Sequence, residues 1–262
     1  MKKIHPTAII HRSAELADDV EVGAYVCIEG HAIIGPGCVI HAHAILSGNV
    51  SLGKNNVLGY GAVVGAEPQD HAFHSKIKSE VIIGDDNVIR EYCTIHRGTA
   101  EGSATIVGNH NFLMAGTHLG HNVKVANKVI IANNVLLAGH VEVQDGAFIS
   151  GGCALHQYVR VGQVSISQGV SALAKDVPPF TIAADRSYVV GLNVIGLRRA
   201  GYTAEQRSEI KEAFKLLYKS GLNTTQALER SKEHKWNKEG RIFFDFVASA
   251  KKRGVCDLRE SS

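Results

Sequence analysis

The sequence predicts an all-β solenoid of the β-helix type, followed by a small α-helical domain. Aliphatic residues recur at every sixth position from Ile4 to Val161, apart from two interruptions. Glycine often follows the aliphatic residue, and small or β-branched residues recur at the fifth place of the six. Apolar residues at helical spacing appear only after residue 200. A period sustained over this length indicates a repeat architecture.

The six-residue period predicts short strands joined by tight turns. An α-helix, with about 3.6 residues per turn, does not present the same face every six residues. A sandwich would instead show strict polar/apolar alternation with loops of varied length. One β-helix turn cannot bury its own apolar edge, whereas stacked turns bury a continuous column. The aliphatic positions are Ile4, Ile10, Leu16, Val22, Ile28, Ile34, Ile40, Leu46, Leu52, Leu58, Val64, Ile83, Ile89, Ile95, Val107, Leu113, Leu119, Val125, Ile131, Leu137, Val143, Ile149, Leu155, Val161 and Leu173.

Two segments break the repeat and are expected to protrude, around residues 65–82 and 98–106. Loops that leave a rigid scaffold are frequent carriers of function. After Leu173 the pair Pro178 and Pro179 is expected to end the strand stacking.

The composition then changes to that of a helical domain. Thr203 and Gln206 form a capping box before a helix that stops by Gly221, and further helices are expected near 224–234 and 238–253. We therefore divide the chain into a β-helix domain, residues 1–185, and a helical domain, residues 186–262.

Composition excludes several functional classes. The 28 basic and 25 acidic residues are too balanced for a nucleic-acid-binding surface. The five cysteines include no C-x-x-C pair, so neither a disulfide framework nor a zinc site is indicated, and a reducing, cytoplasmic setting fits best. No run approaches the roughly 18 apolar residues that a membrane span needs. We expect a cytoplasmic protein with no membrane span.

The register converts sequence into spatial neighbours, because adding 18 to a position gives the residue stacked on it in the next coil. His121 then lies over Gly139, and Gly139 over Gln157, while Asn122 lies over His140. An imidazole is a suitable general base for a hydroxyl that attacks an acyl group, and a glycine can bring its backbone N–H close to the developing oxyanion. No serine or cysteine stands in a convincing nucleophile setting, which favours direct transfer without a covalent enzyme intermediate.

Several sequence motifs resemble those of known protein families. The repeat resembles the hexapeptide family, which implies a left-handed parallel β-helix. The strings NVIREYCTIHRGT, HLGHN, LAGHV, LHQY, DVPPF and GLNVIGLRRAG occur in the order, and with the C-terminal helices, of the acyl-[acyl-carrier-protein]–UDP-N-acetylglucosamine O-acyltransferase family. That resemblance implies transfer of a 3-hydroxyacyl chain from acyl carrier protein to the sugar 3-hydroxyl, the first step of lipid A synthesis. It also implies a cytosolic homotrimer with active sites between subunits and no cofactor or metal.

The resemblance also implies roles for individual residues. His121 matches the general base and Gly139 the oxyanion donor. Arg199 and Asn193 match residues lent by a neighbouring subunit to the UDP, and Gly169 matches the position that limits acyl-chain length. The remaining substrate-binding matches are Asp70, His118, Asn122, His140 and Gln157.

Departures from the family pattern lie on the nucleotide-sugar side. Asn122 stands where the family usually has aspartate, Ile195 where an acidic residue is common, and Ala200 where a second basic residue is common. The lysine expected two places after Asp70 is also missing, and Lys76 or Lys78 are the nearest candidates to replace it. A 3-amino analogue of the UDP-sugar is therefore an alternative acceptor.

Two other functional classes are compatible with a β-helix of this kind. Carbonic-anhydrase-like enzymes of the same fold bind zinc through histidines of adjacent subunits, and the chain has 14 histidines. A non-catalytic scaffold should show flat faces without excursions. Neither class explains the DVPPF and GLNVIGLRRAG strings. N-acylating relatives in lipid A synthesis usually carry an extra N-terminal domain, whereas here the repeat begins at Ile4.

Overall fold

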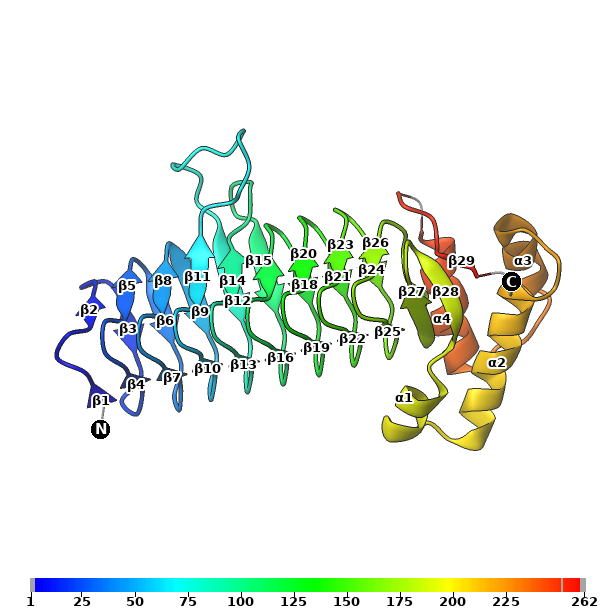
Figure 1. Ribbon diagram of the computed structural model, residues 1–262, viewed down its shortest axis with the longest axis horizontal. Coiled ribbons are helices and arrows are strands. Elements are labelled where there is room, and N and C mark those ends of the chain that lie inside the picture. The colour runs from blue at the N-terminus through cyan, green and yellow to red at the C-terminus, as the bar shows by residue number, and fades with distance from the viewer. Residues whose placement is uncertain (1–2, 251, 260–262) are drawn as a thin grey trace.

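The computed structural model describes residues 3–250 and 252–259. The chain coils into a long parallel β-helix, with three ladders of short strands, and four helices pack at its C-terminal end (Figure 1). The predicted fold, a left-handed parallel β-helix followed by a helical region, is confirmed. No helix among the described residues is long and apolar enough to cross a membrane.

Each coil contributes one strand to each of three sheets, which are named A, B and C here. Sheet A contains β1 (Lys3–Ile4), β4 (Glu21–Val22), β7 (Val39–Ile40), β10 (Val57–Leu58), β13 (Val88–Ile89), β16 (Phe112–Leu113), β19 (Ile130–Ile131), β22 (Phe148–Ile149), β25 (Ile166–Ser167), β27 (Thr181–Ala184), β28 (Tyr188–Leu192) and β29 (Asp257–Leu258). Sheet B contains β2 (Ile9–Ile10), β5 (Cys27–Glu29), β8 (Ile45–Ser47), β11 (Val63–Ala66), β14 (Thr94–His96), β17 (His118–Leu119), β20 (Leu136–Leu137), β23 (Ala154–Leu155) and β26 (Ala172–Leu173). Sheet C contains β3 (Glu15–Leu16), β6 (Ala32–Ile34), β9 (Asn49–Leu52), β12 (Glu80–Ile83), β15 (Ala104–Val107), β18 (Lys124–Val125), β21 (Glu142–Val143) and β24 (Arg160–Val161).

The predicted aliphatic positions form the core along most of the coil. Leu119, Leu137 and Leu155 follow one another in sheet B, each at most 2% exposed. Burying one such side chain stabilises the fold by about 1.5–3 kcal/mol, and this gain recurs at nearly every strand. The residue before each aliphatic residue points outward, which leaves one exposed row on each sheet.

The turns between sheets form three edges. The BC edge (residues 120–123, 138–141 and 156–159) joins sheet B to sheet C, and the CA edge (126–129, 144–147 and 162–165) joins sheet C to sheet A. The AB edge (132–135, 150–153 and 168–171) joins sheet A to sheet B.

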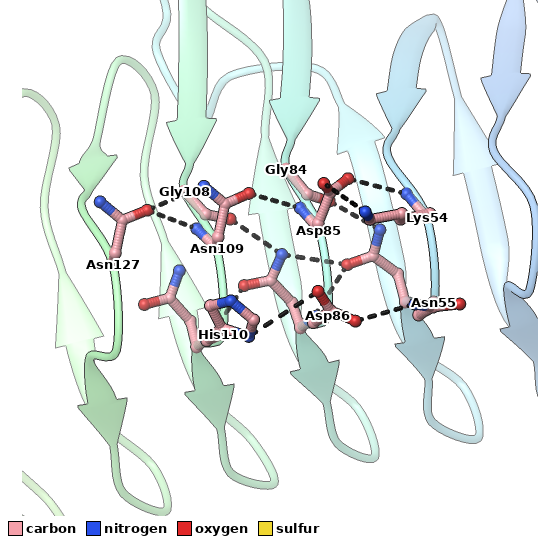
Figure 2. A network of polar contacts seen from close by, with 12 residues as sticks. Lys54, Asn55, Gly84, Asp85, Asp86, Gly108, Asn109, His110 and Asn127 are labelled. Atoms are coloured by element: carbon pink, nitrogen blue, oxygen red, sulfur yellow. Dashed lines mark hydrogen bonds and ion pairs between the residues drawn. The ribbon is translucent and has the colours of Figure 1, made fainter.

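The CA edge shows how side chains cap these turns. The second residue of each turn accepts, through its side chain, the backbone N–H of the equivalent residue one coil earlier (Figure 2). Asn109 Oδ1 accepts from Asp85 N–H at 2.7 Å, and Asn127 Oδ1 accepts from Asn109 N–H at 2.8 Å. Asp145 continues the series by accepting from Asn127 N–H at 2.8 Å. Few backbone donors are therefore left open on this edge.

Both predicted excursions protrude from the coil, and they are shorter than expected. Residues 67–79 leave between β11 and β12, and residues 97–103 leave between β14 and β15. Strand pairing in sheet C continues past both insertions, since Asn49 pairs with Glu80 and Glu80 pairs with Ala104. Both loops leave where sheet B passes to sheet C, on one side of the coil (Figure 1).

The prediction that Pro178 and Pro179 end the strand stacking is wrong for sheet A. There β27 still pairs in parallel with β25 and then forms an antiparallel pair with β28. The prolines lie in the link between sheets C and A, where they interrupt no ladder of sheet A. Sheets B and C do end before them, at β26 and β24.

The helical end contains α1 (Val194–Arg199), α2 (Ala204–Tyr218), α3 (Thr224–Ser231) and α4 (Lys238–Ala248). The capping box before α2 is confirmed, since Thr203 accepts from Gln206 N–H and Gln206 accepts from Thr203 N–H. The short α1 was not predicted, and α4 ends five residues before the predicted position 253. The division at residue 185 stays a prediction, because β28 and β29 complete sheet A from the second segment.

Candidate active site

His121 lies on the BC edge against Gly139, as the register predicts. A Cβ placed on Gly139 would lie 2.4 Å from both Cε1 and Nε2 of the His121 ring, a separation at which something must shift. Only a glycine therefore leaves room for the imidazole in this position. His121 itself is half-buried and keeps part of its ring accessible.

Asn122 fixes which ring nitrogen of His121 is free. Its Oδ1 lies 3.1 Å from Thr99 N, which can only donate, so the atom at this position must be the amide oxygen. The same oxygen accepts from Thr99 Oγ1 at 3.0 Å and lies 3.0 Å from His121 Nδ1. His121 Nδ1 must then carry the proton, and Nε2 keeps its lone pair. The second excursion thus sets the tautomer of the candidate base.

Gly139 offers an open backbone donor beside that base. The residue is buried, yet within residues 3–250 and 252–259 nothing accepts a hydrogen bond from its N–H. On the CA edge the equivalent N–H groups of Asn109 and Asn127 are capped by side chains of the next coil. Above Gly139 the next-coil residue is Gln157, which is exposed and does not cap it. An unpaired donor in a buried residue is costly unless a ligand uses it.

His118 occupies the outer row of sheet B, on the strand that enters the edge. Its Nδ1 lies 2.8 Å from Thr94 Oγ1, and its ring lies 5.1 Å from that of His96. Burial, and then the neighbouring His96, lower the pKa of His118 below its usual value. His96 donates from Nδ1 to the carbonyl of Glu67 at 2.6 Å, where the first excursion begins. This pair of rings links the excursion to the site.

His140 continues the site along the edge. Its ring meets that of His121 edge-on at 5.1 Å and stacks on Tyr158 at 4.6 Å. Asn122, His140 and Tyr158 share a left-handed backbone with φ of 60°, 61° and 67°, which is why their side chains align from coil to coil. Burial, and then the charges of His121, Lys252 and Lys124, lower the pKa of His140 below its usual value.

The structure does not bring the other predicted residues to His121 within one chain. Asp70 lies exposed on the first excursion, where its carboxylate accepts from Ala72 N–H at 2.9 Å. Asn193 caps α1 by accepting from Gly196 N–H at 3.0 Å and donates to the carbonyl of Val164 on the CA edge at 2.8 Å. Arg199 is exposed at the end of α1. Gly169 is exposed on the AB edge.

Sequence reasoning missed Thr99, His96 and Tyr158. His96 immediately precedes the second excursion and Thr99 lies within it, and there the coil offset is 24 residues instead of 18, as the pairing of Thr94 with His118 shows. Applying the longer offset across that break would have placed His96 over Gly120. Tyr158 could have been found from the regular register, since it stacks on His140 as His140 stacks on Asn122.

Within the described residues, no group of three or more histidine, cysteine, aspartate or glutamate side chains is arranged to hold a metal ion. What the site offers is a proton acceptor, His121 Nε2, next to an open backbone donor, Gly139 N–H. This combination suits acyl transfer to a nucleophile that must lose a proton.

Comparison with known proteins identifies the family. A model described as Udp N-acetylglucosamine O-acyltransferase, domain 2, matches residues 176–256, and a bacterial transferase hexapeptide model matches residues 31–66 and 104–139. The acyl-[acyl-carrier-protein]–UDP-N-acetylglucosamine O-acyltransferase of Burkholderia orbicola is 41% identical over 235 residues, which cover 89% of each chain. The enzyme of the same name from a Synechocystis species is 45% identical over 227 residues, 86% of this chain and 82% of that one.

The crystal structure of the Francisella novicida UDP-N-acetylglucosamine acyltransferase has the same fold. It superimposes with a TM-score of 0.94 at 37% identity and covers 99% of this chain and 95% of its own. The resemblance carried by the sequence strings is thus confirmed along nearly the whole chain. This chain belongs to the acyl-[acyl-carrier-protein]–UDP-N-acetylglucosamine O-acyltransferase family.

Proposed function

We propose that the protein transfers a 3-hydroxyacyl chain from acyl carrier protein to the 3-position of the glucosamine of UDP-N-acetylglucosamine, the first step of lipid A biosynthesis. The observation that carries the proposal is the pairing of His121 Nε2 with the open N–H of Gly139. The name of the family supplies the two substrates, and the carrier-bound donor implies a cytoplasmic reaction.

The pairing supports a direct transfer. His121 Nε2 takes the proton of the sugar hydroxyl as its oxygen attacks the thioester carbonyl. The carbonyl oxygen becomes an oxyanion and accepts the Gly139 N–H. The C–S bond then breaks, the carrier thiolate takes the proton from His121, and the sugar ester remains. Asn122 keeps the ring in the required tautomer throughout, since its oxygen accepts from Nδ1.

The outward rows support a homotrimer. Sheet A presents a continuous apolar row, and sheet B presents Leu136, Ala154 and Ala172 below His118, whereas sheet C presents Lys124, Glu142 and Arg160 at the same level. Two apolar faces that share the AB edge suit a closed ring in which sheet A of one subunit faces sheet B of the next. The row on sheet A is Val39, Val57, Val88, Phe112, Ile130, Phe148, Ile166 and Ile182.

That arrangement gives Asn193 and Arg199 a route to the site. Both belong to α1 and its cap, which are bonded to the CA edge at Val164. With sheet A facing the neighbour's sheet B, the CA edge of one subunit lies beside the neighbour's BC edge. The guanidinium of Arg199 would then bind the diphosphate. A molar mass of one chain by light scattering at working concentrations would contradict the trimer.

The row of sheet B also suits the acyl chain. It runs from His118 through the exposed Leu136 to Ala172, beside the exposed Gly169. Ala172 lies three coils from His118, which is about 14 Å at the usual strand spacing. Gly169, without a side chain, would leave the far end of this surface open, in keeping with its proposed role in limiting chain length.

Replacement of His121 tests the mechanism. His121→Ala should lower kcat with acyl carrier protein as donor by at least about a hundredfold, the usual contribution of a general base. The molar mass and the unfolding midpoint should stay unchanged. Activity that survives the replacement would place the base elsewhere.

A second acceptor is supported by Asn122. A neutral amide stabilises an imidazolium less than a carboxylate does, and an amine needs less base assistance than a hydroxyl because it is the stronger nucleophile. The 3-amino analogue of the UDP-sugar would then be acylated on nitrogen by the same residues. Turnover with each acceptor at equal concentration decides between them, and a strong preference for the ordinary sugar would exclude the analogue as the main substrate.

A further inference from the structure

The C-terminal segment returns to the BC edge beside the site. Arg253 Nε donates to the carbonyl of Gln157 at 2.8 Å, and its Nη2 donates to His156 Nδ1 at 2.7 Å. Lys252 Nζ lies over the ring of Tyr158, 4.0 Å from its centroid. Residues almost a hundred positions apart in the sequence are thus joined at one turn.

Lys252 ends a stack that begins at His121. The successive separations are 5.1 Å from His121 to His140, 4.6 Å from His140 to Tyr158, and 4.0 Å from Tyr158 to the ammonium. The ammonium therefore lies no more than about 14 Å from the His121 ring. A substrate that reacts at His121 reaches Lys252 if it extends along the edge.

A recess of about 490 Å³ opens between this stack and sheet C. Its walls include His140, Tyr158, Arg160, Glu142 and Lys252. Arg160 is already neutralised by Asp176, with its Nε 2.8 Å from Oδ2.

The charges around the recess leave Lys252 available. Glu142 lies next to Lys124 in the outer row of sheet C, so a cation other than Lys252 flanks this carboxylate. Among the residues that the structure describes, none accepts a hydrogen bond from the Lys252 ammonium, which carries three N–H donors. The face of Tyr158 holds this cation in place by a cation–π contact and does not use those donors.

We propose that Lys252, with His140 and Tyr158, forms a subsite for a phosphate group of one of the two substrates. The proposal rests on the proposed function, because both of its substrates carry phosphate: the nucleotide sugar in its diphosphate, and the carrier protein in the phosphopantetheine arm. Lys252, whose ammonium carries three N–H donors, and His140 both line this recess. The donor's arm is favoured, since it extends away from a thioester at His121 and ends in a single phosphate.

Inhibition of acyl transfer from acyl carrier protein tests the subsite and shows which of the two substrates supplies the phosphate group. The inhibition constants of phosphopantetheine and of pantetheine are compared in the wild type, and those of UDP and uridine form the second pair. The variants are Lys252→Gln, the charge-preserving Lys252→Arg, and Lys235→Gln as a control at an exposed lysine between α3 and α4.

We expect the wild type to bind phosphopantetheine about tenfold more tightly than pantetheine, the usual worth of a hydrogen-bonded charge. This ratio should fall to near one in Lys252→Gln and persist in Lys252→Arg and Lys235→Gln. If only the ratio of the inhibition constants of uridine and UDP falls to near one in Lys252→Gln, the subsite holds the nucleotide's phosphate. If neither ratio changes, or if phosphate never improves inhibition, the subsite is refuted. Wild-type turnover is measured first, so loss of the proposed function itself would be seen separately.

Discussion

Gly139→Ala separates the position of the His121 ring from its chemistry. The added methyl would lie 2.4 Å from Cε1 and Nε2 of that ring, whereas ordinary contacts begin at 3.4 Å. The backbone φ of Gly139 is not among the positive values, so alanine fits the turn without backbone strain. The Gly139 N–H also remains. The perturbation is therefore confined to a displacement of the imidazole by about 1 Å.

The expected loss follows from that displacement. A misplacement of about 1 Å in a reacting group costs on the order of a hundredfold in rate. The ring also has to strain its 3.0 Å contact with Asn122 as it moves. We expect kcat to fall about a hundredfold, with a smaller change in KM for the nucleotide sugar, because the variant retains the side chains of all the predicted sugar-binding residues.

Steady-state kinetics with acyl carrier protein as donor provide the assay. Gly191→Ala is the matched control, since a Cβ there meets nothing within 4 Å and its φ is not positive. Both variants should unfold at the wild-type temperature. A Gly139→Ala enzyme with wild-type kcat would show that the imidazole does not work from the position against Gly139.

Three further outcomes are expected. Asn122→Asp keeps every hydrogen bond to Oδ1 and adds a negative charge 3.0 Å from His121 Nδ1. Two unit charges 4 Å apart attract by about 4 kcal/mol near a protein surface, and after partial solvent screening we expect about a tenfold rise in kcat with the hydroxyl acceptor. An unchanged kcat would contradict the tautomer assignment. A methionine side chain can be accommodated at position 169, because a Cβ there meets only the carbonyl oxygen of Gly151, at 3.4 Å. When acyl carrier proteins with acyl chains of different lengths are compared as donors, Gly169→Met should shift the preference to shorter chains. An unchanged preference would show that Gly169 does not limit the chain length. The pKa values of His118 and His140 are lowered on folding, so the folded chain binds fewer protons than the unfolded chain just below the ordinary histidine pKa of 6.5. Stability is therefore present above that value and lost as pH falls through the window beneath it, and His118→Gln should flatten this decline in the urea midpoint.

Most of the fold could be predicted because one physical constraint repeats. A two-residue strand and a turn fix which residue points inward, and the register then follows by counting. Counting fails where the chain leaves the coil. The two excursions, at residues 67–79 and 97–103, change the offset between stacked residues, and Thr99 and His96 were missed for this reason.

Contacts made by the C-terminal segment could not be predicted from the pattern. Lys252 and Arg253 reach Tyr158 and Gln157 through the packing of four helices, and no periodicity relates their positions. The two prolines were misjudged for a related reason. Their effect depends on which sheet they border, and this is set by the hairpin of β27 and β28 that follows them.

The part of the site that could be predicted rests on a difference between two edges of the same coil. On the CA edge, asparagine and aspartate side chains accept the N–H of the turn one coil earlier, and these turns are closed. On the BC edge the equivalent N–H of Gly139 stays open, because Gln157 does not cap it. A glycine there admits the His121 ring, and the uncapped turn supplies the donor for an oxyanion. The same repeat thus builds a turn series that is capped by side chains on the CA edge, and it leaves the Gly139 N–H uncapped beside His121 on the BC edge.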